Sequence, residues 1–329
     1  MISNVVTSIR SRKIWTTRGF IIRGGVAIAI ILGALLTNRS FVGWGVFASF
    51  AILMVPIGRI RSFLFSFGPY AATWFIFTAL RSASDETPLA KTLNLEAPDF
   101  ERELFRGQLP SITLQDRLYD HQNLHWYDFA TTAVHWSYFI VPHAVAIYLW
   151  YKHPAVFRRF LGAMIILLSM GLAIYFLLPS NPPWMAPEPC NSPSCPVVYR
   201  VMEKVGQDLG GGLYNASYKV IGESNPRAAM PSIHTAITIL LIFPAFAVSR
   251  RWGLIMLAYG LAMGYSLMYM GEHYFIDVIA GAAIAAYGWY AFPMVAKLIE
   301  AARKPIARPI PAPAATNQST GPPQESVPA

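Results

Sequence analysis

The sequence is poor in charged residues. Only 13% of its 329 residues are Asp, Glu, Lys or Arg, whereas 54% are hydrophobic. Soluble domains carry about twice that share of charge. Too few polar side chains remain to cover a surface that faces water, which argues against a soluble globular enzyme, and the high apolar content argues equally against a disordered chain.

Cysteine is nearly absent. Its two copies, Cys190 and Cys195, lie in one predicted loop. A disulfide between them would close a short Pro-containing loop in an oxidising compartment, and two free thiols are the alternative. The sequence also lacks the H-E-x-x-H and paired-cysteine spacings of zinc sites, so neither a metal nor another cofactor is predicted.

Long hydrophobic runs, in contrast, are abundant. Apolar stretches of about 17–25 residues predict membrane-spanning helices. Eight such stretches occur, at residues 20–37, 41–58, 63–80, 129–150, 157–178, 230–248, 253–270 and 274–296. The predicted fold class is therefore all-α, a polytopic membrane bundle of about eight transmembrane helices.

The basic residues test this topology independently of hydropathy. Eight spans place both termini on one side of the membrane. Of the 26 Lys and Arg residues, 16 fall on that side, whereas 15 of the 17 acidic residues fall on or near the other side. Both termini are therefore predicted to be cytoplasmic, in the plasma (inner) membrane, and the net charge of +9 reflects topology and not binding to nucleic acid.

The predicted spans and loops divide the chain into three parts. These are residues 1–62 with two added spans, a core at 63–296 and a disordered Pro/Ala-rich cytoplasmic tail at 297–329. Two long loops of the core, 81–128 and 179–229, face outward, and functional residues are often found on such loops. The first loop mixes aromatic residues with charges, as helices lying in the membrane interface do, with a solvated loop as the alternative.

Ionisable residues inside spans are costly and mark candidate sites. The topology places His234, His273 and Asp277 within the outer turns of two different helices, at one depth. Asp277 follows His273 by four residues, so on a helix the carboxylate would lean toward the imidazole.

Two histidines and one aspartate suffice for double displacement at phosphorus. His273 would attack, Asp277 would hold its tautomer and stabilise the imidazolium, and His234 would protonate the leaving oxygen. Water or an alcohol would then release the phosphate. From position alone, a structural His–Asp pair and a metal site remain as alternatives.

Two short motifs carry a resemblance to a known family. Residues 231–234 read Pro-Ser-Ile-His and residues 269–277 read YMGEHYFID. They resemble the second and third motifs of the type-2 phosphatidic acid phosphatase superfamily. The forms P-S-x-H and H-Y-x-x-D, together with a Pro-Pro-Trp element at 182–184, are most similar to its inositol phosphorylceramide synthase-like (inositolphosphotransferase) branch.

The resemblance covers roughly residues 63–296 and has specific implications. It implies a six-helix catalytic core and a metal-independent phosphohistidine mechanism. His273 would be the nucleophile, with Asp277 as its partner and His234 as the general acid. Ser232 would contact the phosphate.

Two cationic elements of the family pattern are missing. The first motif, a Lys followed six residues later by Arg-Pro, is absent, and Leu267 stands where the third motif has an Arg. Phosphoryl transfer needs positive charge around the phosphate oxygens, so other cations are expected to replace them. Arg227 is the first candidate, with a contact to lipid headgroups as its alternative, and Lys219, Lys204 and Arg200 are further candidates. A cation-poor pocket favours a phosphodiester-like substrate and hence headgroup transfer.

Other polar residues near the predicted site have open roles. Glu272 would act as a second base or bind the acceptor hydroxyl, unless the helix dipole alone explains it. Asp128, His135 and His143 share one helical face, which should turn toward the bundle. Asp128 could reach the site, whereas His143 lies roughly 22 Å deeper and is expected to pack in the core.

The sequence thus predicts an integral membrane enzyme with its active site on the extracytoplasmic face. Its substrates would be a phosphate-bearing membrane lipid and either water or a hydroxyl acceptor, with no cofactor and no nucleic acid. One alternative is a lipid or polyisoprenyl-phosphate transporter that uses the polar stripe of Asp128, His135 and His143 as a pathway. Another is an inactive scaffold. The complete His–His–Asp set at one face favours the enzyme.

Overall fold

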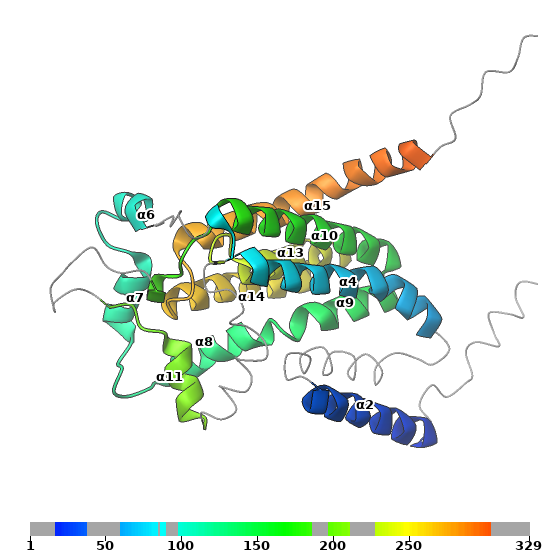
Figure 1. Cartoon of the computed structure of the whole chain (residues 1–329), viewed down its shortest axis with the longest axis horizontal. Helices are drawn as coiled ribbons and strands as arrows, with labels where there is room; N and C mark the ends of the chain where they lie inside the picture. Colours follow the sequence, from blue (N-terminus) through cyan, green and yellow to red (C-terminus); the bar gives the residue numbers. More distant parts are fainter. Residues whose placement is uncertain are drawn as a thin grey trace, which may run out of the picture. The chain divides into compact units, whose positions relative to one another are not determined.

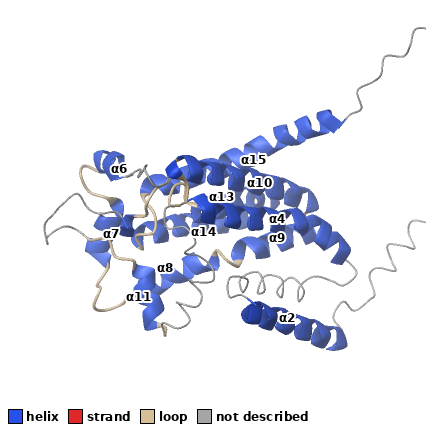
Figure 2. Ribbon diagram, in the orientation of Figure 1, coloured by secondary structure: helices blue, strands red, loops and turns tan. Residues whose placement is uncertain are grey.

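The protein is described by a computed structural model over residues 17–37, 60–84, 86–89, 98–185, 197–210 and 228–303. Within these residues every regular element is a helix, as Figure 2 shows, which confirms the all-α class. In chain order the elements are α2 (Thr17–Thr37), α4 (Ile60–Ser84), α6 (Pro98–Leu104), α7 (Pro110–Leu118), α8 (Trp126–Ser137), α9 (Val141–Lys152), α10 (Pro154–Leu177), the 3₁₀ turn η3 (Pro183–Met185), α11 (Val201–Asp208), α13 (Ile233–Val248), α14 (Arg250–Tyr269) and α15 (Phe275–Arg303).

Four helices in the described part of the chain are long and apolar enough to cross a membrane. They lie in α4, α10, α14 and α15, and their apolar segments are Arg61–Arg81, Pro154–Leu177, Arg250–Tyr269 and Phe275–Ala302. Two shorter apolar helical stretches, Ile21–Ile30 and Ile233–Val248, fall in α2 and α13. These six segments coincide with six of the eight predicted spans. The predicted span at 41–58 lies outside the described residues.

The prediction of one continuous helix over residues 129–150 is wrong. α8 ends at Ser137 and α9 begins at Val141, with a turn between them. Pro142 explains the break, because it has no amide hydrogen and its ring would clash with the carbonyl four residues earlier. At the start of a new helix the missing amide costs nothing. Hydropathy could not detect the turn, since its residues are themselves largely apolar.

The predicted outward loops contain short helices. α6 and α7 lie in the first loop and α11 in the second. The expectation of helices over residues 100–127 is therefore confirmed, although their place at a membrane interface stays a prediction.

The chain divides into two compact units, Met1–Pro293 and Met294–Ala329. All further description concerns the first unit. The predicted domain boundaries after residues 62 and 296 remain predictions, and the tail from residue 304 onward lies outside the described residues.

Among the helices that the structure describes, α13 is the most enclosed. It packs against α10 and α14, and α10 packs in turn against α4 and α9 (Figure 1). Ala236, Ile237 and Leu240 of α13 have no exposed surface. A helix that is apolar on all sides suits such a position inside a bundle.

Two glycines let α15 approach neighbouring backbone closely. A Cβ on Gly281 would lie 2.4 Å from the carbonyl oxygen of Ser232, and one on Gly288 would lie 2.7 Å from that of Ala163. Both distances are shorter than any real contact of a Cβ atom. The absence of a side chain at Gly281 therefore lets α15 lie against the segment that starts α13, and the absence of one at Gly288 lets it lie against α10.

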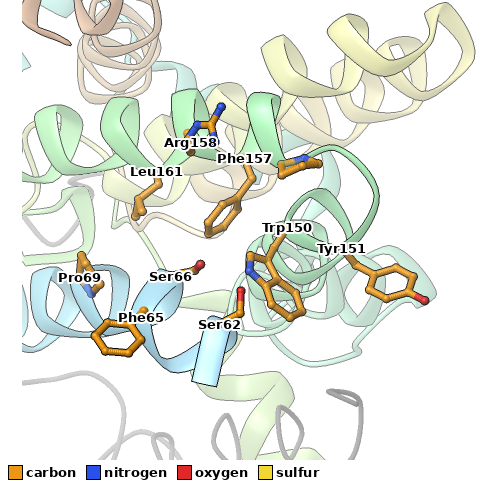
Figure 3. Close-up of a pocket in the computed structure, with 10 residues that line it drawn as sticks. Ser62, Phe65, Ser66, Pro69, Trp150, Tyr151, Phe157, Arg158 and Leu161 are labelled. Carbon is orange, nitrogen blue, oxygen red and sulfur yellow. The ribbon is translucent and has the colours of Figure 1, made fainter. Parts of the chain in front are cut away.

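A cavity of about 710 Å³ lies between the first turns of α4 and α10 and the last turn of α9. Figure 3 shows Ser62 and Ser66 of α4 facing Phe157 and Leu161 of α10 across it. None of the predicted site residues lines this cavity. The candidate catalytic residues gather instead where α13 and α15 begin.

Candidate active site

The three predicted catalytic residues come together where α13 and α15 begin. His234 lies in the first turn of α13, Asp277 in the first turn of α15, and His273 in the segment between α14 and α15. The ring centroids of the two histidines are 6.0 Å apart. Nδ1 of His273 is 3.4 Å from Oδ2 of Asp277, and both residues are buried. His234 and His273 are 39 positions apart in the chain and nevertheless share one site.

The His–Asp contact forms for a different reason from the predicted one. α15 begins only at Phe275, so His273 and Asp277 do not share a helical face. Instead, Oδ2 of Asp277 accepts the backbone N–H of Tyr274 at 2.9 Å. A carboxylate that satisfies a free amide at a helix N-terminus is a common arrangement. It turns the same oxygen toward the imidazole of His273.

A tight turn positions His273. Gly271 has φ of 74°, in the left-handed region that favours glycine. A Cβ there would also lie 2.9 Å from the carbonyl oxygen of Tyr199. The backbone N–H of Trp184 donates to the carbonyl of Gly271 at 3.2 Å, so the Pro-Pro-Trp element supports this turn.

The segment that carries His234 is fixed from two directions. Its Ser232 N–H donates to the carbonyl of Asp277 at 3.0 Å. The hydroxyl of Ser180, which follows α10, accepts the N–H of Met230 at 2.8 Å. α15 and the end of α10 together therefore set where α13 starts.

Ser232 is the N-cap of α13. Its Oγ accepts the N–H of Thr235 at 3.3 Å, and the residue is fully buried. Such a cap satisfies one of the free amides of the first helical turn. The hydroxyl keeps its own proton and can donate it to a phosphate oxygen. This predicted contact stays a prediction.

Two arginines bring positive charge to this end of the bundle. Nε of Arg200 donates to Oε1 of Glu272 at 2.8 Å, and its guanidinium lies 4.3 Å from the ring centre of Trp184. Arg81, at the end of α4, lies 5.9 Å from the ring centre of Tyr175 and within electrostatic range of His234. The ion pair with Arg200 accounts for Glu272; a role in binding an acceptor stays a prediction.

Sequence reasoning missed Arg81. The available signal was its position, because a basic residue at the predicted outward end of an apolar helix departs from the positive-inside pattern. Of the other predicted residues, Arg227, Lys219, Cys190 and Cys195 lie outside the described residues. Their proposed roles therefore stay predictions.

Asp128 and His143 make hydrogen bonds within the protein. Both oxygens of the buried Asp128 are used, Oδ2 by the N–H of His125 at 2.7 Å and Oδ1 by the hydroxyl of Tyr269. His143 pairs through Nδ1 with the hydroxyl of Tyr70 at 2.8 Å. The expected core role of His143 is confirmed, and the described geometry gives Asp128 a capping task at the start of α8.

His135 also reaches the site, which the sequence did not predict. Its ring lies 4.7 Å from that of His234, and the ring of Tyr138 lies 4.4 Å from His234. The helical wheel had placed His135 on the face toward the bundle. The identity of its neighbour depends on how α8 and α13 pack.

Glu101 of α6 is a second residue that sequence reasoning missed. It is 1% exposed, and its Oε2 accepts the N–H of Ile276 at 3.1 Å, in the first turn of α15. Burial raises the pKa of Glu101 to about 6, and the nearby charge of Asp277 adds to this effect. α6 is thereby attached to the helix that carries Asp277.

The described residues contain no group of three or more His, Cys, Asp or Glu side chains that could hold a metal ion. The site, as far as the structure describes it, is thus a set of imidazoles and carboxylates with arginines nearby.

Comparisons with known proteins identify relatives of this chain. Residues 99–291, more than half of the sequence, match the model of the PAP2 superfamily. The phosphoinositol dihydroceramide synthase of Bacteroides thetaiotaomicron is 27% identical over 145 residues, which make up 43% of this chain and 47% of that relative. The aligned region therefore spans about half the length of the curated relative. No solved structure matches the chain.

Proposed function

Because this chain belongs to the PAP2 superfamily, whose members are phosphatases or phosphotransferases, we propose that it transfers a phosphoryl group from a lipid-linked phosphate through a phosphohistidine. The family and the apolar helices together make it an integral membrane protein. One observation carries the proposal: His273 contacts Asp277 through Nδ1 at 3.4 Å, with His234 at a ring distance of 6.0 Å.

In the first half of the reaction His273 is the nucleophile. Its Nδ1 faces Asp277, which leaves Nε2 to attack phosphorus. The Nε2–P bond forms as the bond from phosphorus to the leaving oxygen breaks. Protonated His234 gives its proton to that oxygen, and Asp277 stabilises the positive charge on the phosphorylated ring.

In the second half a hydroxyl group attacks the phosphohistidine. His234, now neutral, takes the proton of this hydroxyl as the new P–O bond forms and the P–N bond breaks. The enzyme returns to its starting protonation state. Water gives hydrolysis, and an alcohol gives transfer of the phospho-headgroup.

Two observations favour headgroup transfer. The relative named above is a phosphoinositol dihydroceramide synthase. The missing cationic motifs suit a phosphodiester, which carries less charge per phosphate than a monoester. Arg81 and Arg200 would then supply the positive charge that stabilises the equatorial oxygens.

The catalytic end would face the extracytoplasmic side, with both termini in the cytoplasm. The distribution of Lys and Arg along the sequence supports this orientation. A site at the end of the helices would meet lipid headgroups directly.

The test uses the full-length protein in nanodiscs, with phosphatidylinositol and phosphatidic acid as separate donors and labelled phosphate. His234→Ala, His273→Ala and Asp277→Ala should each lower turnover by about 10³-fold or more. His143→Ala, on α9 beside Tyr70, serves as the folded control and should keep most of the activity. Retained turnover in all three variants would overturn the proposal.

Two further measurements address the intermediate. Rapid quenching and peptide mass spectrometry should find phosphate on His273, and its absence under turnover would contradict the covalent step. Full activity in excess chelator would support metal independence, which is part of the proposal. A lipid comparison of cells with and without the gene would identify the donor.

The transporter alternative lacks support in the geometry. Two members of its proposed pathway, Asp128 and His143, are engaged in hydrogen bonds with Tyr269 and Tyr70. A transporter would move the labelled lipid across the bilayer without releasing phosphate.

A further inference from the structure

One buried histidine at the site has no part in the mechanism above. His135 of α8 is 4% exposed, and its ring lies 4.7 Å from that of His234 with an angle of 66° between the ring planes. His234 is the residue that must give and take a proton. The neighbour of a proton-transfer group influences both its orientation and its charge.

The neighbour of Nδ1 assigns a tautomer to His135. Nδ1 lies 2.8 Å from the sulfur of Met202. A thioether sulfur can only accept a hydrogen bond, so Nδ1 carries the hydrogen. In the neutral ring Nε2 is then a bare acceptor with its lone pair exposed to any nearby donor.

That acceptor has no partner in the part of the chain that the structure describes. Nε2 of His135 is buried and makes no hydrogen bond. A buried polar atom without a partner is costly, and few are kept without a reason. His143, on the next helix, provides a contrast, because it pairs with the hydroxyl of Tyr70.

We infer that His135 is a positioning residue for His234: its Nε2 accepts the N–H of His234 that is turned away from the substrate. The inference rests on the proposed function, because it assigns a partner to the proposed general acid. The ring centroids lie 4.7 Å apart, and a rotation of the His234 side chain would close this hydrogen bond. Catalytic hydrogen bonds are often long in free enzymes and tighten when the substrate binds.

The assignment accounts for both half-reactions. Protonated His234 has two N–H groups, one for the leaving oxygen and one for His135. After the first proton transfer His234 keeps its second N–H, which still donates to His135, so the free lone pair of His234 faces the substrate. No proton moves onto His135, and the balance of the reaction is unchanged.

A neutral partner suits this task better than a carboxylate would. His273 carries a phosphoryl group and benefits from the full negative charge of Asp277. His234 must release its proton in one step and regain it in the next. A neutral imidazole orients it and stabilises its charged form less than a carboxylate does, so the proton stays transferable.

Other charged groups near this pair shape its response to pH. His273 and Arg81 lie within electrostatic range of His234, from the segment before α15 and from the end of α4. His273 and Arg200 lie within range of His135. These groups are left unchanged in the variants below, so that any shift can be assigned to His135.

The decisive measurement is the pH dependence of kcat/KM for the lipid donor. Formation of the phosphoenzyme needs protonated His234, so activity falls on the alkaline side of the profile. Without the acceptor at residue 135 the charged form of His234 loses a hydrogen bond. His135→Leu should therefore move the alkaline limb to lower pH by about one unit and reduce the maximum rate by about 10- to 100-fold.

Two further variants separate this role from packing. His135→Gln offers an acceptor oxygen near the position of Nε2 and should restore most of both effects. Met202→Leu keeps His135 but removes the acceptor of its Nδ1–H, so the ring can change tautomer. The alkaline limb of Met202→Leu should also move to lower pH, by a smaller amount than that of His135→Leu. This variant gives a readout even if His135→Leu does not fold.

His143→Leu is the matched control. It removes a partly buried imidazole from the next helix, α9, and should leave the position of the limb unchanged. The inference is overturned if His135→Leu is folded and its limb coincides with that of the wild type, or if His135→Gln behaves like His135→Leu. Failure of the proposed function would look different, because His234→Ala would then retain turnover.

Discussion

The two ends of the helix bundle differ in what their helices bury. At the end where α13 and α15 begin, the buried side chains include His135, His273 and Asp277. At the other end, the cavity between α4, α9 and α10 is lined mostly by aromatic and aliphatic residues. α4 and α10 contribute to both ends, since Arg81 at the end of α4 and Ser180 after α10 lie at the polar end. Burial of ionisable groups is expensive, so their concentration at one end indicates where function resides.

The two ends also use their helix termini differently. At the polar end, Asp277 and Glu101 accept amides of the first turn of α15 or of the residue before it. Both carboxylates thereby satisfy free backbone donors, and Asp277 also contacts His273. In the case of Asp277, a structural requirement of the helix start is thus met by a group that the proposed chemistry needs.

The largest expected effect concerns the charge of Asp277. Asp277→Asn keeps the shape of the side chain but removes the negative charge beside His273. By analogy with aspartates that orient catalytic histidines, kcat should fall by about 10³- to 10⁴-fold. Ser66→Ala in the cavity at the other end should change kcat less than twofold. Similar losses of kcat in both variants would contradict the proposed functional difference between the two ends.

A pair of arginines provides the second comparison. Arg81→Gln removes a cation within electrostatic range of His234, and kcat/KM should fall by about 10- to 100-fold because a charge-assisted contact to phosphate is lost. Arg158→Gln removes a cation that lines the distant cavity and should have little effect. The measurement is steady-state kinetics with one donor lipid. Equal losses would mean that Arg81 acts only through general stability.

Two glycines on α15 form the third comparison. Gly281→Ala and Gly288→Ala both force a Cβ against backbone, at Ser232 and at Ala163. Each should lower the melting temperature by roughly 3–8 °C, since overpacking costs about 1–3 kcal/mol. Only Gly281→Ala should also reduce turnover, by about tenfold, because it shifts the start of α13. Equal loss of activity in both would contradict a localised site.

The smallest expected effect concerns Glu101. Its folded-state pKa of about 6 lies above the ordinary value of 4.5, so the folded protein binds more protons than the unfolded chain between these two values. This carboxyl therefore lowers stability as the pH rises from 4.5 to 6. Glu101→Gln should remove this contribution. The change in melting temperature between pH 4.5 and pH 6 should then be smaller than in the wild type by a few degrees. An unchanged pH dependence in the variant would argue against a buried, titrating Glu101.

Much of the fold could be predicted from local features of the sequence. Hydropathy located six segments that the structure also shows as helices, with ends that differ by a few residues. It failed at residues 138–140, where Pro142 breaks the chain into α8 and α9 within a continuously apolar stretch. Hydropathy averaged over a stretch of sequence responds to composition, whereas the break depends on the one missing amide hydrogen of Pro142.

The candidate site was predicted in part. The motifs identified His234, His273 and Asp277, but the reason offered for the His–Asp contact was wrong, because His273 precedes α15. Arg81 and Glu101 were missed because neither belongs to a motif. Each becomes part of the site only through contacts with residues more than 90 positions away.

The sequence by itself determined that this is an all-α membrane protein and which short segments carry its chemistry. Both follow from local properties, namely hydropathy over one helix length and residue types at fixed spacing. Only the tertiary structure decided which groups surround the two histidines. That outcome depends on how α4, α6, α8, α13 and α15 pack, and the partners of a buried side chain are set by these long-range contacts and not by its neighbours in the chain.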